Sequence, residues 1–208
     1  MAGKLGIEDG KRLVKAARLI IEDNLSGTDR NKDLIERLLG GFGEKRGVFV
    51  TLNRYPSHEL RGCIGLPNPV MPLKDAVRSA SISAATDDPR FPPVKSEEMD
   101  EIIIEVSVLT PPEKIVVSSP KEYRNKIKIG RDGLIIKNGP YSGLLLPQVP
   151  VEWKWDIDEY LAHICMKAGL TPDMWLDEQT ELYSFQAQVF KEKTPGGEII
   201  EEKFEQYC

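Results

Sequence analysis

The segment RGVFVTLNRYPSHELRGCIGL, residues Arg46–Leu66, predicts two neighbouring strands. Its first nine residues are rich in aromatic and β-branched side chains, which is typical of a strand. Residues 59–66 follow after the short turn YPSH and predict a second strand, antiparallel to the first. Helices and strands elsewhere in the chain do not alternate regularly. The pattern therefore favours an α+β fold with mainly antiparallel sheets flanked by helices.

Three other segments space their apolar residues as a helix does. They are residues 7–25, 72–88 and 156–170. Pro72 suits a first helical turn, where its missing N–H costs nothing. Asp156 or Asp158 is expected to cap the last of these helices, and Gly169 to end it.

Further strands are expected in the second half of the chain. Residues 101–109 predict a buried strand, and residues 126–150 predict several short strands separated by glycine-marked turns. Residues 181–193 alternate like a single strand with one wet face. The tail, residues 194–208, is acidic and broken by glycines, so we expect it to be flexible or loosely packed. The length of 208 residues fits a single domain over residues 1–208.

Composition makes several classes of function less favoured. The net charge is −5, and no basic stripe is visible, so nucleic-acid binding is disfavoured. One local basic cluster stays possible in three dimensions, formed by Arg12, Lys15, Arg18, Lys45, Arg46 and Arg54. Three cysteines without a pairing pattern and an N-terminus without an apolar leader favour the cytoplasm. No apolar run is long enough for a membrane span.

Metal and phosphate sites are not indicated. The chain has only two histidines, and it lacks the CxxC, HxxxH and HExxH motifs. GRDG and GPYSG contain glycines but match no phosphate-binding loop, so both are interpreted as hairpin turns. We therefore predict neither a metal nor a cofactor.

Cys63 is the sharpest candidate for chemistry. A nucleophilic cysteine needs a base or a positive charge to lower the pKa of its thiol. Arg61 lies two residues away, on the same face if the strand is regular, whereas His58 has the opposite parity. Gly62 and Gly65 would let a ligand, or another segment of the protein, approach the backbone closely. On residue types alone, packing is favoured over a reactive site, but both interpretations stay open.

Two further groups of residues are candidates. Asp87, Asp88 and Arg90 lie in a rigid, proline-bounded loop after a predicted helix, where they either shape a site or stabilise the loop as an ion pair. Gln148, Glu152 and Trp155 follow directly on an apolar strand. Either this run forms the polar wall of a pocket, or Trp153 and Trp155 cover the core beneath the loop and Asp156 caps the next helix.

Four segments together resemble the AMMECR domain family. They are LRGCIG, residues 60–65; AVRSASISAATDDPRFPPV; EVSVLTPPEKI; and the long run from IGRDG to KAGL. The match runs in order from about residue 47 to residue 175. The residue after the signature, Leu66, is a threonine, histidine or phenylalanine in many relatives, so we do not expect it to be catalytic.

The resemblance implies a larger and a smaller lobe with a cleft between them, and it places the signature near the cleft. It implies no reaction. Prokaryotic family genes often accompany genes for a Memo-type protein and a radical S-adenosylmethionine enzyme, which are therefore the expected partners.

Two main functional hypotheses remain. The first is a catalytic or small-molecule-binding cleft built around LRGCIG, and the second is a non-enzymatic accessory module that works with those partners. A nucleic-acid-related role ranks third. Whether the protein is an enzyme stays open.

Overall fold

The structure, a computed structural model, describes residues 4–203 and divides the chain into two compact units. Unit 1 contains the described residues up to Pro111 together with Gln188–Glu202, and unit 2 is centred on Pro112–Ala187. The chain therefore leaves unit 1 once and returns to it. The α+β class with antiparallel sheets is confirmed. The cleft between two lobes stays a prediction.

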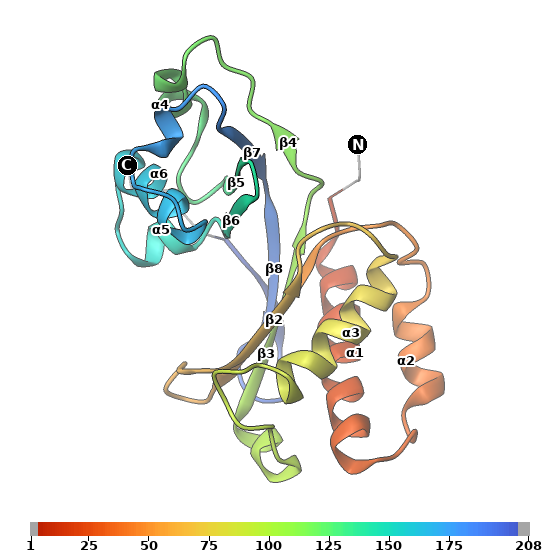
Figure 1. Cartoon of the computed structure of the whole chain (residues 1–208). Helices are drawn as coiled ribbons and strands as arrows, with labels where there is room; N and C mark the ends of the chain where they lie inside the picture. Colours follow the sequence, from red (N-terminus) through yellow and green to blue (C-terminus); the bar gives the residue numbers. More distant parts are fainter. Residues whose placement is uncertain (1–3, 204–208) are drawn as a thin grey trace. The chain divides into compact units, whose positions relative to one another are not determined.

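Unit 1 is built on a five-stranded sheet with helices on one side (Figure 1). The strands lie in the order β2-β1-β3-β8-β9. Their bounds are Val48–Arg54 for β1, Leu60–Leu66 for β2, Ile102–Leu109 for β3, Ala187–Glu192 for β8 and Ile199–Glu202 for β9. The helices are α1 (Ile7–Ser26), α2 (Lys32–Leu39) and α3 (Leu73–Thr86), and a 3-10 helix covers Ser96–Glu101.

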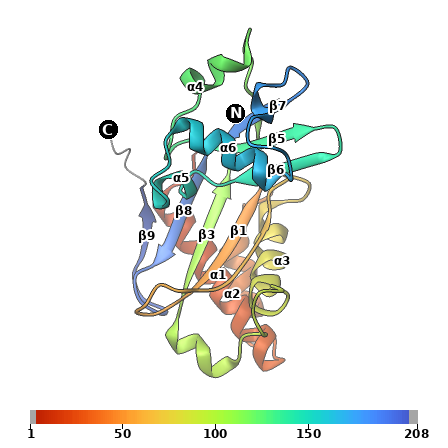
Figure 2. The same ribbon diagram turned by 60° about the vertical axis from the view of Figure 1, so that its left-hand side comes forward.

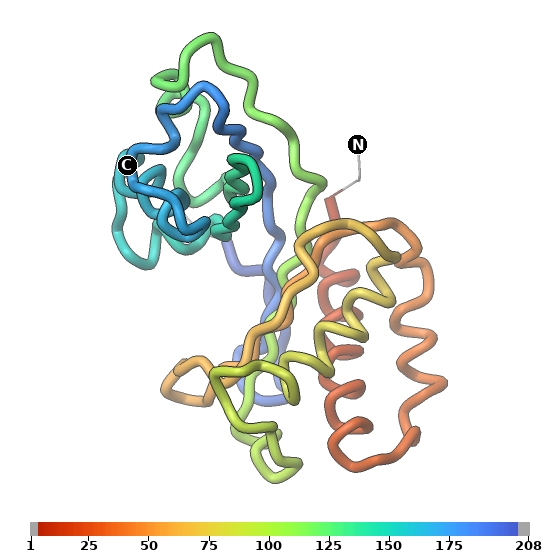
Figure 3. The backbone as a smooth tube through the Cα atoms, in the orientation of Figure 1, coloured from red at the N-terminus to blue at the C-terminus, as the bar shows by residue number. Residues whose placement is uncertain are grey.

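The predicted hairpin is confirmed. β1 pairs antiparallel with β2 on one side and with β3 on the other, and Thr51 lies opposite both Cys63 and Glu105. The tube in Figure 3 traces this hairpin as the orange segment. The register of β1 and β2 shifts after Leu52, so that Asn53 pairs with Leu60 and Arg61 has no partner position. A shift of this kind marks a β-bulge in β2.

The helices cover the apolar face of the sheet. Alternate residues of β1 are fully buried, and they pack into one core with residues of α1 and α3. Figure 2 shows these helices against one face of the sheet. The helix expected over residues 72–88 is present as α3, and its buried face is formed by Leu73, Ala76, Val77, Ala80 and Ala84, which are all at most 2% exposed. Burial of this continuous apolar surface is the main favourable term for unit 1.

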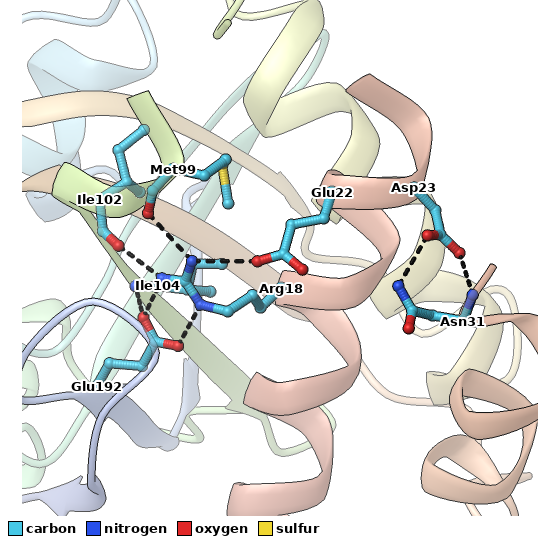
Figure 4. Close-up of polar contacts among 8 residues, drawn as sticks. All are labelled: Arg18, Glu22, Asp23, Asn31, Met99, Ile102, Ile104 and Glu192. Atoms are coloured by element: carbon cyan, nitrogen blue, oxygen red, sulfur yellow. Dashed lines mark hydrogen bonds and ion pairs between the residues drawn. The ribbon is translucent and has the colours of Figure 1, made fainter. Parts of the chain in front are cut away.

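A buried ion pair fastens the returning strand β8 to α1. Arg18 contacts Glu192 at 2.6 Å, and both side chains are largely buried (Figure 4). Arg18 also donates to the carbonyls of Met99 and Ile102, while Glu192 accepts the N–H of Ile104. The pair thus joins α1, β3 and β8, and its hydrogen bonds satisfy charges that would otherwise be costly to bury.

Unit 2 holds a four-stranded sheet and its own core. The strands lie in the order β4-β7-β5-β6. They are β4 (Glu113–Lys114), β5 (Gly133–Asn138), β6 (Tyr141–Leu145) and β7 (Glu181–Phe185). The helices are α4 (Tyr123–Lys126), α5 (Val149–Glu152) and α6 (Ile157–Lys167), with 3-10 turns at Pro120–Glu122 and Met174–Leu176. The core gathers apolar residues of α6, β5 and β7.

Local signals in unit 2 agree with the structure in most places. Asp156 caps α6 by accepting the N–H groups of Asp158 and Glu159 at 2.9 Å each. Gly169 has a φ of 77°, as the residue after a helix often does. The β5–β6 hairpin turns at Gly139-Pro140, so GPYSG begins with a hairpin turn, as expected.

The prediction of a single strand over residues 181–193 is wrong. Residues 181–193 form two strands, β7 and β8, which belong to different sheets and different units. Part of the expected flexible tail forms β9, which pairs with β8, whereas residues 204–208 lie outside the described residues. None of the described helices is long and apolar enough to cross a membrane.

Candidate functional site

The signature segment forms the edge strand β2, and the loop after α3 binds its backbone. The N–H of Cys63 donates to Asp88 Oδ2 at 2.8 Å, and Arg90 donates to the Cys63 carbonyl at 3.2 Å. Asp88 and Arg90 also pair with each other at 2.7 Å. An edge strand leaves backbone groups unpaired, so these two side chains act in place of a further strand.

The Asp88–Arg90 pair stabilises the ionised form of the Asp88 carboxylate. Asp88 is only 4% exposed, and hydrogen bonds from Arg90 and from the Cys63 N–H hold its pKa well below its ordinary value, although burial opposes this. A carboxylate that accepts several such bonds stays ionised and fixed in place. Asp87, in contrast, is exposed at the end of α3 and accepts a hydrogen bond from Thr86.

Arg61 faces a different set of partners from Cys63. Its guanidinium is buried and makes two hydrogen bonds of 2.9 Å to Glu98. It also donates to the carbonyls of Pro92 and Pro93. Arg61 and Cys63 were expected on the same face because side chains alternate along a regular strand. The β-bulge at Arg61 interrupts that alternation. Arg61 therefore holds the loop before β3 in place.

The thiol of Cys63 is half-buried, and its surroundings favour the protonated form. Burial raises its pKa, and the hydrogen bond from Thr51 Oγ1 at 3.3 Å and the charge of Arg90 only partly oppose this. The nearby carboxylates of Glu105 and Asp88 raise the pKa further. A reactive cysteine requires the opposite balance.

Protein atoms already fill the space beside the two signature glycines. A Cβ on Gly62 would lie 2.2 Å from the carbonyl oxygen of Ala84 at the end of α3. A Cβ on Gly65 would lie 2.1 Å from the ring of Phe49 on β1. Both glycines thus permit close internal packing, which is the structural alternative that the sequence left open.

A large cavity lies elsewhere, within unit 2. It has a volume of about 1070 Å³, and its lining comes from the loop before β5, from α5 and from the start of α6. The lining residues are Ile127, Lys128, Ile129, Pro150, Val151, Glu152, Lys154, Trp155, Asp156 and Ile157. Pockets that hold small molecules have this size and this mostly apolar lining with a few polar groups.

The cavity contains two of the three residues expected as a polar wall. Glu152 and Trp155 line it, whereas Gln148 does not. The Trp155 ring stacks on His163 of α6 with 3.8 Å between centroids, which holds the indole in place. Gln148 lies at the start of α5, and its side-chain oxygen is buried without a hydrogen-bond partner among the described residues.

Neither a metal centre nor a strongly basic surface stands out among residues 4–203. Within residues 4–203, no three histidine, cysteine or acidic side chains come together in a way that could hold a metal ion. Of the six cations considered as a basic cluster, Arg12, Arg18, Arg46 and Arg54 are each paired with a carboxylate. Such pairing removes most of the positive field that a nucleic acid would need.

Several residues of these sites carried no signal in the sequence. Thr51 and Glu98 meet the signature only through long-range pairing, with Glu98 lying 37 residues from Arg61. Lys128 and Lys154 are ordinary lysines in sequence, and only the fold brings them to one cavity.

The fold and the cavity define an α+β protein of two compact units, one of which offers a ligand-sized pocket. The chain belongs to the AMMECR1 family, whose profile matches residues 14–190, and the resemblance is thereby confirmed.

Its relatives include archaeal proteins of similar length. Protein MJ0810 of Methanocaldococcus jannaschii is 61% identical over 199 residues, which cover 96% of this chain and 98% of that protein. A Methanococcus aeolicus protein is 56% identical over 200 residues, covering 96% and 99%. The crystal structure of the uncharacterized protein PH0010 from Pyrococcus horikoshii matches with a TM-score of 0.85 at 55% identity, covering 94% of this chain and 97% of that one.

Proposed function

We propose that this protein binds a small molecule non-covalently and that the cavity of unit 2 is the binding site. The observation that carries the proposal is the cavity itself, about 1070 Å³ and lined by apolar side chains, Trp155 and a few charged groups. The stacking of Trp155 on His163 supports it, because a ring already held in position loses little freedom when a ligand binds.

The same reasoning moves the proposed site away from the signature segment. Cys63 has a raised pKa, its backbone is bound by Asp88 and Arg90, and Arg61 is occupied by Glu98. We therefore assign LRGCIG the role of positioning β2 and the loops around it rather than a role in a reaction.

A fragment screen by ligand-observed NMR tests the proposal. Val151 lines the cavity and is half-buried, so Val151→Trp would fill part of the space. Val117 is a half-buried valine at another hollow of unit 2, and Val117→Trp serves as the matched control. We expect fragments that bind the wild type and the Val117 variant but not the Val151 variant.

Two results would overturn the proposal. One is a screen in which the wild-type protein binds no fragment. The other is a set of fragments that the Val151→Trp protein, shown to be folded by its thermal transition, binds as well as the wild type does.

A second candidate function is an accessory role with protein partners. Several large apolar side chains of unit 2 are exposed, including Trp153 at 68% and Val116 at 78%. Exposed apolar groups can mark an interaction surface. Size-exclusion chromatography with purified Memo-type and radical S-adenosylmethionine proteins would test this role. Elution of all components as separate species would count against it.

A further inference from the structure

The cavity of unit 2 has a mostly apolar wall and four charged residues, and these four differ in the contacts they already make with the protein. Its wall is formed mainly by isoleucine, valine and proline side chains and by the ring of Trp155. Two carboxylates, Glu152 and Asp156, and two lysines, Lys128 and Lys154, also line it. Which of the four charges can serve a ligand depends on what each already contacts.

The Asp156 carboxylate is engaged by the protein itself. Asp156 accepts two backbone N–H groups as the cap of α6, and a carboxylate at a helix N-terminus is already compensated. Glu152 also has an interaction partner. In contrast, neither lysine forms an ion pair with any carboxylate of residues 4–203. The two lysines are therefore the charged groups of this lining that have no ion pair among these residues.

The backbone beneath each lysine is fixed. The N–H of Lys128 donates to Asp132 at 2.9 Å, and the Lys128 carbonyl accepts from Asp132 and Arg131. At Lys154, the N–H donates to Val151, and the next residue, Trp155, donates to Pro150. The backbone of both lysines is therefore held in place at the lining of the cavity.

Lys154 occupies a position that usually belongs to glycine. The two bonds just described form a Schellman motif at the end of α5, in which the residue after the helix is left-handed. Lys154 has a φ of 55° there. The same motif ends α1 at Gly27 and α6 at Gly169, so this chain uses glycine at both comparable positions. A lysine here costs backbone energy, which a role for its ammonium group would explain.

We propose that the ligand of this cavity is a small organic oxyanion, a carboxylate or a phosphate ester carried on an apolar body. The inference rests on the proposed function and specifies its ligand class. The apolar wall and Trp155 would hold the body, while Lys128 and Lys154 would bind the anionic group. Because both lysines are exposed, their contribution is to selectivity among ligands of one shape more than to total affinity.

Isothermal titration with three matched probes tests the inference. The probes are 1-naphthylacetate, 1-naphthyl phosphate and the neutral 1-naphthylacetamide. We expect both anions to bind about fivefold more tightly than the amide at low salt, since two exposed cations contribute modestly, and the preference should shrink at high salt. The tighter of the two anions identifies the anionic group.

Two double variants separate the lysines of the cavity from general charge. Lys128→Met with Lys154→Met should remove the preference for the anions over the amide. Lys126→Met with Lys167→Met removes the same charge from exposed positions of unit 2 that do not line the cavity, and it should preserve the preference.

The outcomes distinguish this inference from the proposed function. Two results would overturn the anion inference alone, provided that Val151→Trp still abolishes fragment binding. One is equal affinity of the wild type for the acid and the amide, and the other is an equal loss of the anion preference in both double variants. Fragments that are insensitive to Val151→Trp would overturn the binding site itself.

Discussion

At the scale of single residues, the signature works through its backbone. Cys63 offers its N–H and carbonyl to Asp88 and Arg90, and its side chain only accepts a hydrogen bond from Thr51. Alanine or serine at this position would keep the backbone contacts. The thiol is therefore not the group on which the local geometry depends.

We predict that native Cys63 reacts slowly with iodoacetamide. Its pKa is raised by burial, so the thiolate fraction near neutral pH is below that of an ordinary cysteine. A Cys208→Ser protein, followed by mass spectrometry from pH 7 to 10, isolates the behaviour of Cys63, because Cys165 is fully buried with a pKa raised to about 11. The same protein in guanidinium gives the reference rate. Native labelling as fast as that reference at pH 7 would refute the prediction.

The Arg61–Glu98 pair leads to a prediction about acid stability. Glu98 has a pKa lowered to about 2 by the hydrogen bonds of Arg61, against an unfolded value of about 4.3. Its contribution is therefore complete above about pH 5 and is lost as the pH falls toward 2. Glu98→Gln should reduce the free energy of unfolding by about 2–4 kcal/mol at pH 7, because Arg61 stays buried without its counter-charge.

Urea denaturation at pH 7 and at pH 3 measures this effect. The difference between the wild type and Glu98→Gln should shrink at the lower pH. Glu97→Gln, at an exposed neighbour in the same 3-10 helix, should leave stability nearly unchanged at both. A difference that does not depend on pH would contradict the assigned role of the ion pair.

At the scale of elements, Gly62 sets the distance between β2 and α3. A Cβ there would lie 2.2 Å from the Ala84 carbonyl oxygen, which is backbone and cannot rotate away. Gly62→Ala should therefore cost about 1–3 kcal/mol of unfolding free energy. Gly43→Ala adds the same methyl group where nothing lies within 4 Å, so it should be close to neutral. Equal stability of the two variants in chemical denaturation would rule out the close contact.

The end of α5 gives a second prediction at this scale. Lys154→Gly should relieve the left-handed backbone and raise the unfolding free energy by up to about 1 kcal/mol. The same change should weaken binding of 1-naphthylacetate. His58→Gly, at the other left-handed non-glycine position of the described residues, should stabilise without any effect on binding. A Lys154→Gly protein that binds the acid as tightly as the wild type would contradict the role of this lysine.

The elements that could be predicted from sequence are those with local signals. α1, α3 and α6 show helical periodicity with recognisable ends, and β1 and β2 are joined by a short turn. The boundary between β7 and β8 was missed because a single residue, Gln186, separates them and no glycine or proline marks the change of sheet. Contacts such as that of Cys63 with Asp88 join residues far apart in the sequence, and the periodicity of apolar residues carries no information about them.

At the scale of the whole molecule, the chain builds two separate cores. One gathers α1, α3 and the five-stranded sheet, and the other gathers α6, β5 and β7. β8 returns to unit 1, where Phe190 packs against Gly10 and Glu192 pairs with Arg18. Unit 1 therefore needs residues that precede unit 2 in the sequence and residues that follow it. The core of unit 2, in contrast, comes from one continuous segment.

This arrangement predicts that the two units lose stability separately. Ile164 is fully buried in the core of unit 2, so Ile164→Ala should cost about 2–5 kcal/mol there. In hydrogen exchange followed by mass spectrometry, peptides from residues 112–187 should lose protection while peptides from α1 and β1 keep theirs. Ile104→Ala, at an equally buried position of unit 1, should give the reverse pattern. If either variant lowered protection uniformly along the chain, the two cores would form one cooperative unit, and a ligand in the cavity of unit 2 would then stabilise both.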